Sequence, residues 1–133
     1  IYSCGQYIDH EGNVCEEMHG LSMADTSAMG RAESSREVSS ISIHGMMFRV
    51  SLWNKIGGFN PEFGSCAVAD FCLRAGQSDI KTVENVYVEL GIVSQNSAWD
   101  DVSKVSNTLF RKKWNDFIVK GDPMYNPQIS YWE

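Results

Sequence analysis

The sequence has no long apolar run and few basic residues, and these two absences exclude several classes of protein. No stretch approaches the roughly 18 apolar residues of a membrane-spanning helix, so we expect no transmembrane segment. Only 11 Lys and Arg stand against 17 Asp and Glu, and the net charge of -6 argues against nucleic-acid binding. The one basic cluster, Arg111-Lys112-Lys113, lies in a helical pattern, where we expect it to face solvent.

Cysteine is sparse as well, with four residues in a chain of 133. That density does not indicate a small disulfide-bonded domain. Cys66 and Cys72 lie in or beside an apolar helical stretch, where cysteine usually serves as a small buried hydrophobe. We therefore expect reduced thiols and a cytoplasmic location, with any membrane association made through other parts of the protein. The chain opens at Ile1 with neither Met nor a signal peptide, so we expect it to be part of something longer.

What is present is the composition of one globular domain, with 43% hydrophobic and 21% charged residues. The alternation of apolar residues after Val38 predicts a central strand over 38–50, packed by a long helix over 101–119. With its other helices and strands, the chain is expected to have an α/β fold. These other elements are strands over 1–8, 14–15, 80–83 and 86–90, a turn over 9–13, and helices over 52–56 and 67–75.

Particular residues are expected to begin or end the two shorter helices. Ser51 is a suitable cap for the first helix, which Gly57-Gly58 should end with a sharp turn. Gly76 is suitably placed as the left-handed residue after the second helix. Gly45 interrupts a strand-like run, which suggests that another group approaches the backbone closely there.

The stretch HGMMFRVSLWNKIGGFNPEFGSCAVADFCLR, which begins at His44, resembles the second half of the family-2, inverting glycosyltransferases. Gly57-Gly58-Phe59 match the G-G-F-D-E turn of that family, and Asn60-Pro61 replace its acidic pair. Asp70, Leu73 and Arg74 match the end of the E-D-x-D-L-x-x-R motif. Upstream YIDHEGNV and downstream FRKKW and DPMYNPQIS are similar to neighbouring family segments. The resemblance implies that residues 1–133 form the acceptor-side portion of a GT-A domain, with a mixed sheet and flanking helices.

In the resembled enzymes a carboxylate deprotonates the acceptor hydroxyl while that hydroxyl attacks the sugar. The E-D-x-D alignment puts Ala67 at the Glu position and Val68 at the position of the base, so we assign no catalytic residue. Asp70 lies nearby but two helical positions away, which points its side chain elsewhere. Its alternative role is a negative charge that stabilises the amino-terminal end of the helix.

The resemblance also implies a divalent cation, since the family often uses Mg²⁺ or Mn²⁺ bound through a D-x-D motif. This chain has no D-x-D, and Glu89 is the nearest potential ligand where relatives place a later His. We therefore expect no metal ion in this chain. A mixed zinc site from Cys4, His10, Cys15 and His19 is a weaker alternative, because the spacing lacks close Cys pairs.

The candidate substrate-binding residues follow from the matched motifs. Each also has a structural interpretation. Glycines often only permit a tight turn, and a His at the end of a strand, as His44 is expected to be, often only forms hydrogen bonds with nearby residues. Four aromatic residues could stack on sugar rings or simply pack in the core: Trp53, Phe59, Phe63 and Trp99. The substrate-binding candidates are His44, Gly45, Gly57, Gly58, Phe59, Glu62 and Asp70.

Three functions remain open at this point. The chain could belong to an active transferase, to a non-catalytic module that binds glycan or a partner, or to a domain kept for assembly alone. The expected partners are a nucleotide-sugar and a glycan acceptor when the whole domain is present. Because the family's nucleotide site precedes the matched region, we expect the chain alone to be inactive. An exposed sheet edge would favour self-association or association with the missing half.

Overall fold

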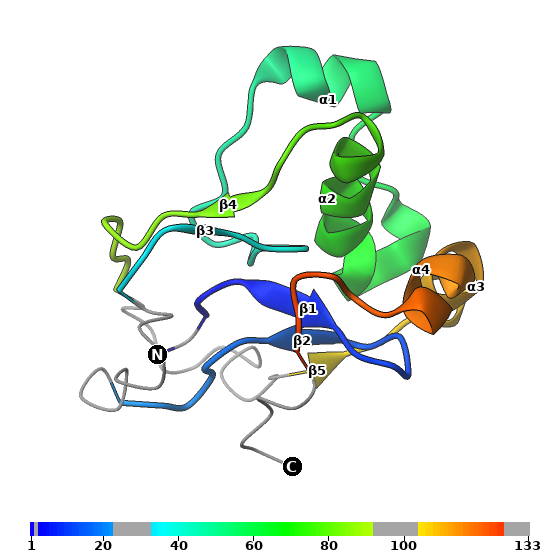
Figure 1. Ribbon diagram of the computed structural model, residues 1–133. Helices are drawn as coiled ribbons and strands as arrows, with labels where there is room; N and C mark the ends of the chain where they lie inside the picture. The colour runs from blue at the N-terminus through cyan, green and yellow to red at the C-terminus, as the bar shows by residue number, and fades with distance from the viewer. Residues whose placement is uncertain (2, 23–32, 92–103, 127–133) are drawn as a thin grey trace.

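The computed structural model describes residues 1, 3–22, 33–91 and 104–126. A three-stranded antiparallel sheet in the order β1-β2-β5 lies at its base (Figure 1). The expected turn after the first strand is confirmed: Asp9 Oδ1 accepts hydrogen bonds from the backbone amides of Glu11 (2.9 Å) and Asn13 (2.8 Å). The strands are β1 (Gln6–Ile8), β2 (Val14–Glu16) and β5 (Lys104–Val105).

A second, two-stranded sheet lies beside the first and consists of β3 (Arg36–Glu37) and β4 (Val83–Glu84), also antiparallel. An isolated bridge joins the two sheets, because Gln6 N donates to Ser40 O (2.8 Å) and Ser40 N donates to Gln6 O (3.2 Å). All strand pairs in the described part of the chain are antiparallel. The expectation of helices together with strands is therefore confirmed, but a mixed sheet is not present among these residues.

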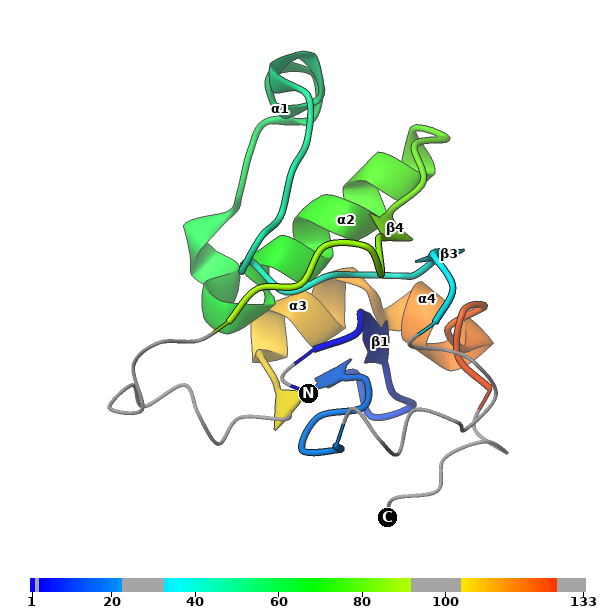
Figure 2. The ribbon, with the colours of Figure 1, turned by 90° about the vertical axis from the view of Figure 1, so that its left-hand side faces the viewer.

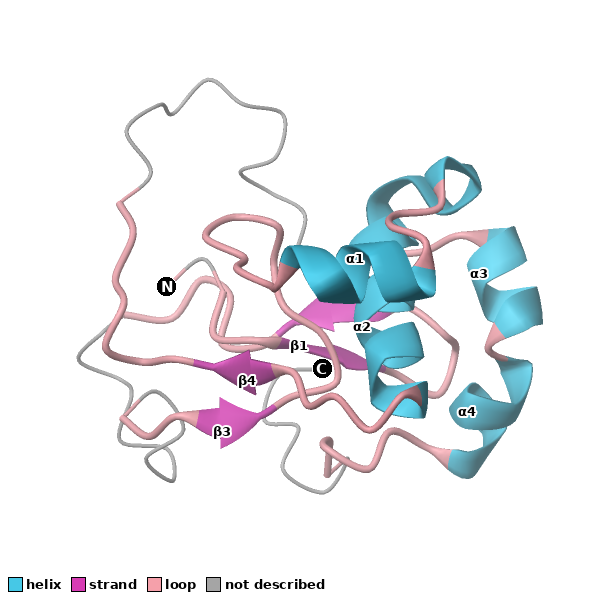
Figure 3. Ribbon diagram, turned by 90° about the horizontal axis from the view of Figure 1, so that it is seen from above, coloured by secondary structure: helices cyan, strands magenta, loops and turns pink. Residues whose placement is uncertain are grey.

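The helices gather on one side of the strands, as the view from above shows (Figure 3). Helix α1 projects from the rest of the molecule on two extended connections (Figure 2). None of the helices in the described ranges has the length and hydrophobicity needed to cross a bilayer. Their bounds are α1 (Val50–Ile56), the 3-10 helix η2 (Pro61–Cys66), α2 (Ala67–Gln77), α3 (Thr108–Lys113) and α4 (Asn115–Lys120).

The core lies where the hairpin, η2, α2 and α3 meet. Phe110 and Cys66 are completely buried, and Phe63 meets Phe110 edge to face with ring centroids 6.2 Å apart. Burial of such apolar side chains is the main favourable term in folding. The other buried members of this cluster are Ile8, Val14, Phe63, Ala67, Ala69, Leu73 and Trp114.

The carboxy-terminal described segment is tied to the hairpin by a buried carboxylate. Asp122 Oδ2 accepts the backbone amide of Ile8 (2.9 Å), and Asp122 Oδ1 accepts the amide of Met124 (2.8 Å) and the hydroxyl of Ser39. Tyr125 stacks on Tyr7 with ring centroids 3.9 Å apart. The DPMY part of the tail motif therefore packs back onto the body, while residues 127–133 lie outside the described ranges.

The expected long helix over 101–119 is wrong. Residues 104–105 form β5, and the helical part is divided at Trp114, whose φ of -100° and ψ of 19° are not helical. The Trp114 indole is buried and donates to Asp70 (2.9 Å), so a tertiary contact accompanies the break. Residues 101–103 lie outside the described ranges.

The expected central strand over 38–50 is also wrong. Val38, Ser39 and Ser40 are all buried, because the chain passes between two neighbours: Val38 N donates to Thr82 O (3.0 Å) and Ser40 pairs with Gln6. The chain then leaves the sheet, and Ile43 is 58% exposed. The alternating pattern after Val38 suggested a strand with one buried face. It belongs instead to an extended segment whose first residues are buried between two neighbouring segments of the chain.

Two helix boundaries differ from expectation, and one agrees. Gly57 ends α1 with φ 88°, as predicted, but Arg49 is the residue before its first turn and Ser51 lies inside the helix. Gly76 lies within α2 rather than after it. The left-handed residue is Asp79 (φ 58°), and the amide of Ile80 donates to Ala75 O (3.0 Å) to close this end. Of the strands expected over 80–83 and 86–90, only Val83 lies in an observed strand, β4 (Val83–Glu84).

Candidate functional site: a glycine turn held by an aspartate-arginine pair

The Gly57-Gly58 turn follows directly from α1. Both glycines have positive φ (88° and 69°), and both backbone amides donate to Trp53 O, at 2.9 and 3.2 Å. A Cβ on Gly58 would lie 2.6 Å from Trp53 Cζ2, which leaves no room for a side chain. The positive φ of residue 58 and its close contact with the Trp53 ring therefore both favour glycine at this position.

Arg74, on α2, holds this turn in place. Its terminal nitrogens donate to the carbonyl oxygens of Ile56 and Gly58, on either side of Gly57. Its Nε donates to Asp70 Oδ2 (2.7 Å), one helical turn earlier. A guanidinium offers several donors in a fixed plane, so one side chain can fix two carbonyls and a carboxylate at once.

Asp70 completes the arrangement from the first turn of α2. Its side chain has no exposed surface, and Oδ1 accepts hydrogen bonds from Lys113 Nζ and from Trp114 Nε1 (2.9 Å). Both carboxylate oxygens are thus occupied by groups of the chain. In this structure Asp70 is a positioning residue that joins α2, α3 and the glycine turn, and its carboxylate is closed to a ligand.

The position expected for a catalytic base lies on the same helix but faces differently. Val68 is half-buried, whereas its neighbours Ala67, Ala69 and Asp70 are buried. The side chain that reaches the surface here has no atom that can accept a proton. Because two residues along a helix differ by about 200° in direction, Asp70 cannot take over this position.

The other candidate substrate-binding residues are not gathered at one point. His44 and Glu62 are exposed, and the Glu62 amide donates to Asn60 Oδ1 (3.0 Å). Gly45 has φ 77°, and a Cβ there would lie 2.3 Å from Leu90 Cδ1. The close approach that Gly45 suggested is therefore made by the chain's own Leu90 side chain.

Phe59 belongs to an aromatic cluster between α1 and α2. Its ring centroid lies 5.0 Å from that of Trp53 and 5.2 Å from that of Phe71, both nearly edge to face. Phe48 stacks on Trp53 at 5.6 Å. Trp53 alone of these is 36% exposed, so one edge of the cluster reaches solvent. Of the other aromatic candidates, Phe63 is in the core and Trp99 lies outside the described ranges.

A second polar cluster, which the sequence did not indicate, lies where the two sheets meet. The Arg36 guanidinium donates to Glu17 and to Cys4 O (2.9 Å) and lies 3.7 Å from Glu84. Burial raises the pKa of both Glu84 and Glu16, and it raises the pKa of the Cys4 thiol to about 11. The only sequence signal was Glu16-Glu17 beside an irregular segment.

No three His, Cys, Asp or Glu side chains in the described ranges are arranged as metal ligands. Cys4, Cys15, Cys66 and Cys72 are all free thiols. Burial raises the pKa of Cys15 to about 12 and that of Cys66 to about 11, which disfavours their thiolate forms. Glu89, the expected nearest metal ligand, is exposed. The expectation that this chain binds no Mg²⁺ or Mn²⁺ stays a prediction.

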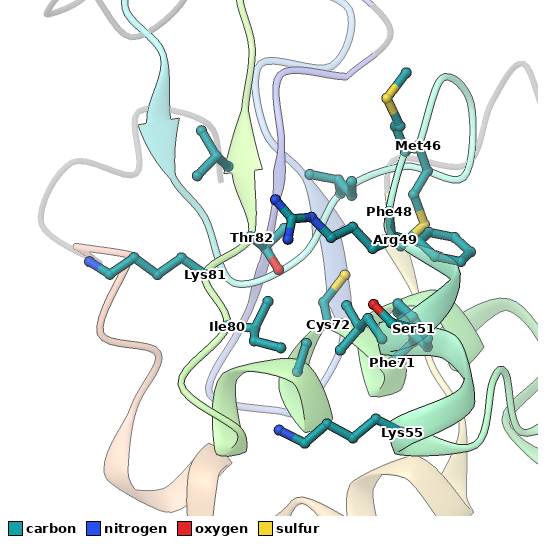
Figure 4. A pocket seen from close by; sticks show the side chains of 15 residues that line it. Met46, Phe48, Arg49, Ser51, Lys55, Phe71, Cys72, Ile80, Lys81 and Thr82 are labelled. Carbon is teal, nitrogen blue, oxygen red and sulfur yellow. The ribbon is translucent and has the colours of Figure 1, made fainter.

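The structure also contains a pocket of about 440 Å³ between α1, α2 and residues 80–83 (Figure 4). None of the seven candidate substrate-binding residues lines it. Its lining combines apolar side chains with Arg49, Lys55 and Lys81. Arg49 and Lys55 are close in the sequence, at α1, but Lys81 follows α2, so only the folded structure shows all three around one pocket.

No protein-family model matches the chain, and neither a curated protein sequence nor a solved structure matches it. The family resemblance rests on the residues of the chain alone.

Proposed function

We propose that this chain is the acceptor-side portion of a family-2-like glycosyltransferase domain and that it does not transfer sugar by itself. One observation carries the proposal. Arg74, which matches the later family motif, donates to Gly58 O in the family-like turn and to Asp70, one helical turn earlier on α2. A chance match of two short motifs would give no reason for the later motif to hold the earlier turn in place.

The arrangement suggests how the chain would serve an acceptor. Arg74 and Asp70 hold the glycine turn, and the turn presents the loop that begins at Phe59 and includes the exposed Glu62. A fixed loop lowers the entropic cost of binding, because its conformation is set before the ligand arrives. In this interpretation Phe59 and Glu62 contact the glycan, and Asp70 only positions them.

The step that the chain lacks is removal of the acceptor proton. An inverting transfer forms the bond from the acceptor oxygen to the anomeric carbon while the bond to the leaving diphosphate breaks, and the hydroxyl proton must pass to a base. Val68 cannot accept it. Loss of a general base typically costs about 100- to 10,000-fold in rate. A non-catalytic glycan- or partner-binding module is therefore the second candidate function, and Val68 is the observation that favours it.

The experiment compares nucleotide-sugar binding and turnover in the wild-type chain and in Val68→Asp. We expect neither protein to transfer sugar from a panel of UDP-, GDP- and CMP-sugars, because a restored carboxylate does not supply a donor site. Val68→Asn is the matched control, with similar size and no base. The proposal is overturned if the wild-type chain turns over a nucleotide sugar, or if Val68→Asp gains turnover that Val68→Asn lacks.

A further inference from the structure

The pocket between α1 and α2 has the size and shape of a small-molecule site. Its volume of about 440 Å³ lies within the range of about 300–1,000 Å³ found for ligand pockets. The floor is formed by buried Phe71, Cys72 and Ala75 of α2, and α1 forms one wall. The opposite wall is the extended segment 80–83, which reaches the pocket with Ile80 and Thr82 (Figure 4).

The charges around this pocket are all of one sign. Arg49, Lys55 and Lys81 line it, and no Asp or Glu does, although the whole chain carries a net charge of -6. Lys81 is paired with Glu37 at 2.7 Å and points away from the pocket. In the part of the chain that the structure describes, the Arg49 and Lys55 side chains make no hydrogen bond or ion pair with the protein.

Arg49 is the cation best placed to meet a ligand. Its side chain extends across the pocket toward Thr82, and Ser51 adds a second hydroxyl from α1 (Figure 4). A guanidinium forms two parallel hydrogen bonds with a carboxylate or phosphate, and hydroxyls can donate to the same oxygens. Burial raises the pKa of the Cys72 thiol, so the floor adds no negative charge that would oppose an anion.

We propose that this pocket binds a small amphipathic anion, with its apolar body on Phe71, Leu52 and Ile80 and its carboxylate or phosphate group at Arg49. An apolar molecule alone would leave the guanidinium without a partner, and a small inorganic anion would leave the apolar floor uncovered. This inference is independent of sugar transfer, because none of the residues proposed to contact a glycan lines the pocket.

Calorimetric titration with four probes below their micelle concentrations tests the proposal. Decanoate and decyl phosphate carry the apolar chain with either anionic group. Decyltrimethylammonium carries the same chain with a positive charge, and acetate carries the charge without the chain. We expect saturable one-to-one binding of decanoate or decyl phosphate, or of both, and at least about 10-fold weaker binding of the other two, a difference of about 1.4 kcal/mol.

Substitutions then place the binding in this pocket. Arg49→Gln should weaken binding of the anionic probes about fivefold, since an ion pair at an exposed side chain contributes about 1 kcal/mol. Lys55→Gln should weaken it less. Lys112→Gln removes the same charge from an exposed position on α3 and should leave the affinity unchanged. Equal binding of the cationic probe, or equal affinity in Arg49→Gln and Lys112→Gln, would overturn the proposal, as would absence of binding by both anionic probes.

Discussion

At the scale of one residue, Asp70 shows how a buried carboxylate can have a purely structural role. Its buried carboxylate receives donors from Arg74, Lys113 and Trp114, and so joins three elements. A buried charge is tolerated only when hydrogen bonds satisfy it, and each of its oxygens is satisfied here. The structure therefore gives Asp at this position a role that requires no reaction.

We predict that Asp70→Ala lowers the free energy of unfolding by about 2 to 3 kcal/mol. Removing one partner of a buried pair leaves the other charges without compensation, and partial exposure of Arg74 and Lys113 keeps the loss at the low end. Urea unfolding measures it. Asp116→Ala, at an exposed site in the first turn of α4, should change stability by only about 0.5 kcal/mol. Equal effects in the two variants would contradict the role given to Asp70.

The two turn glycines should differ in their tolerance of alanine. Gly57→Ala meets no atom within 4 Å and should cost only the left-handed conformation, about 1 to 2 kcal/mol. Gly58→Ala has the same backbone cost and also overlaps the Trp53 ring, so we expect it to cost about 1 kcal/mol more. Thermal unfolding of both variants tests this order. A smaller loss in Gly58→Ala would show that Trp53 moves freely.

Glu16 should make the stability of the protein depend on pH. Burial raises the pKa of Glu16 despite hydrogen bonds from Ser3 and Gln6 and the nearby charges of His19 and His44. Because the pKa of Glu16 is raised in the folded state, folding favours the protonated carboxyl. The contribution of Glu16 to the free energy of unfolding is therefore fully present below about pH 4.5 and is lost as the pH rises through the folded pKa. Glu16→Gln should therefore gain stability relative to wild type on going from pH 4 to pH 7. Urea unfolding of both proteins at pH 4 and pH 7 measures this. A stability difference between variant and wild type that stayed constant or fell from pH 4 to pH 7 would contradict the role given to Glu16.

At the scale of secondary-structure elements, the sequence predicted what local residues determine. The turn at Asp9 and the end of α1 at Gly57 follow from side-chain acceptors and glycine conformation, which act within a few residues. The helix over 101–119 and the strand over 38–50 failed because distant contacts decide them. Trp114 is held by Asp70 from α2, and Val38 is enclosed by Thr82. Periodicity carries no information about such neighbours.

The amino-terminal cap of α3 gives a test at this scale. Asn107 Oδ1 accepts the backbone amide of Phe110 (3.0 Å), and its Nδ2 donates to Glu62 O (3.2 Å). Asn107→Ala should lower stability by about 1 kcal/mol, because the cap and the link to η2 are both lost. Asn107→Ser retains a cap acceptor and should recover most of that loss, as measured by thermal unfolding. Equal losses in Ala and Ser would show that the link to Glu62, rather than the cap, matters.

At the scale of the whole molecule, the candidate site was partly predictable. The sequence placed Gly58, Asp70 and Arg74 in family-like motifs, and in the structure Arg74 donates to Gly58 O and to Asp70. It could not show that Asp70 is buried or that Arg49 lines a largely apolar pocket, because both facts depend on how the helices pack. The metal and nucleotide expectations stay predictions.

The surface also carries several large apolar side chains around α1 and the segment that follows β4. Met47 is 92% exposed and Tyr87 is 86% exposed. Exposed apolar surface of this kind is typical of interaction sites. The predicted self-association, or association with a donor-binding half, is compatible with it and stays a prediction. Other exposed members are Ile43, Val50, Val83, Val88 and Leu90.

The central proposal is that this chain carries the acceptor side of the domain and that the donor site lies outside it. Backbone amide chemical shifts, recorded by NMR while the 133-residue chain is titrated with nucleotide sugars and with neutral oligosaccharides, test it most directly. We predict that at least one oligosaccharide moves the amides from Gly57 to Glu62 in a saturable way and that no nucleotide sugar moves any amide. Saturable shifts at micromolar nucleotide sugar would contradict the claim, because the donor site would then lie within this chain.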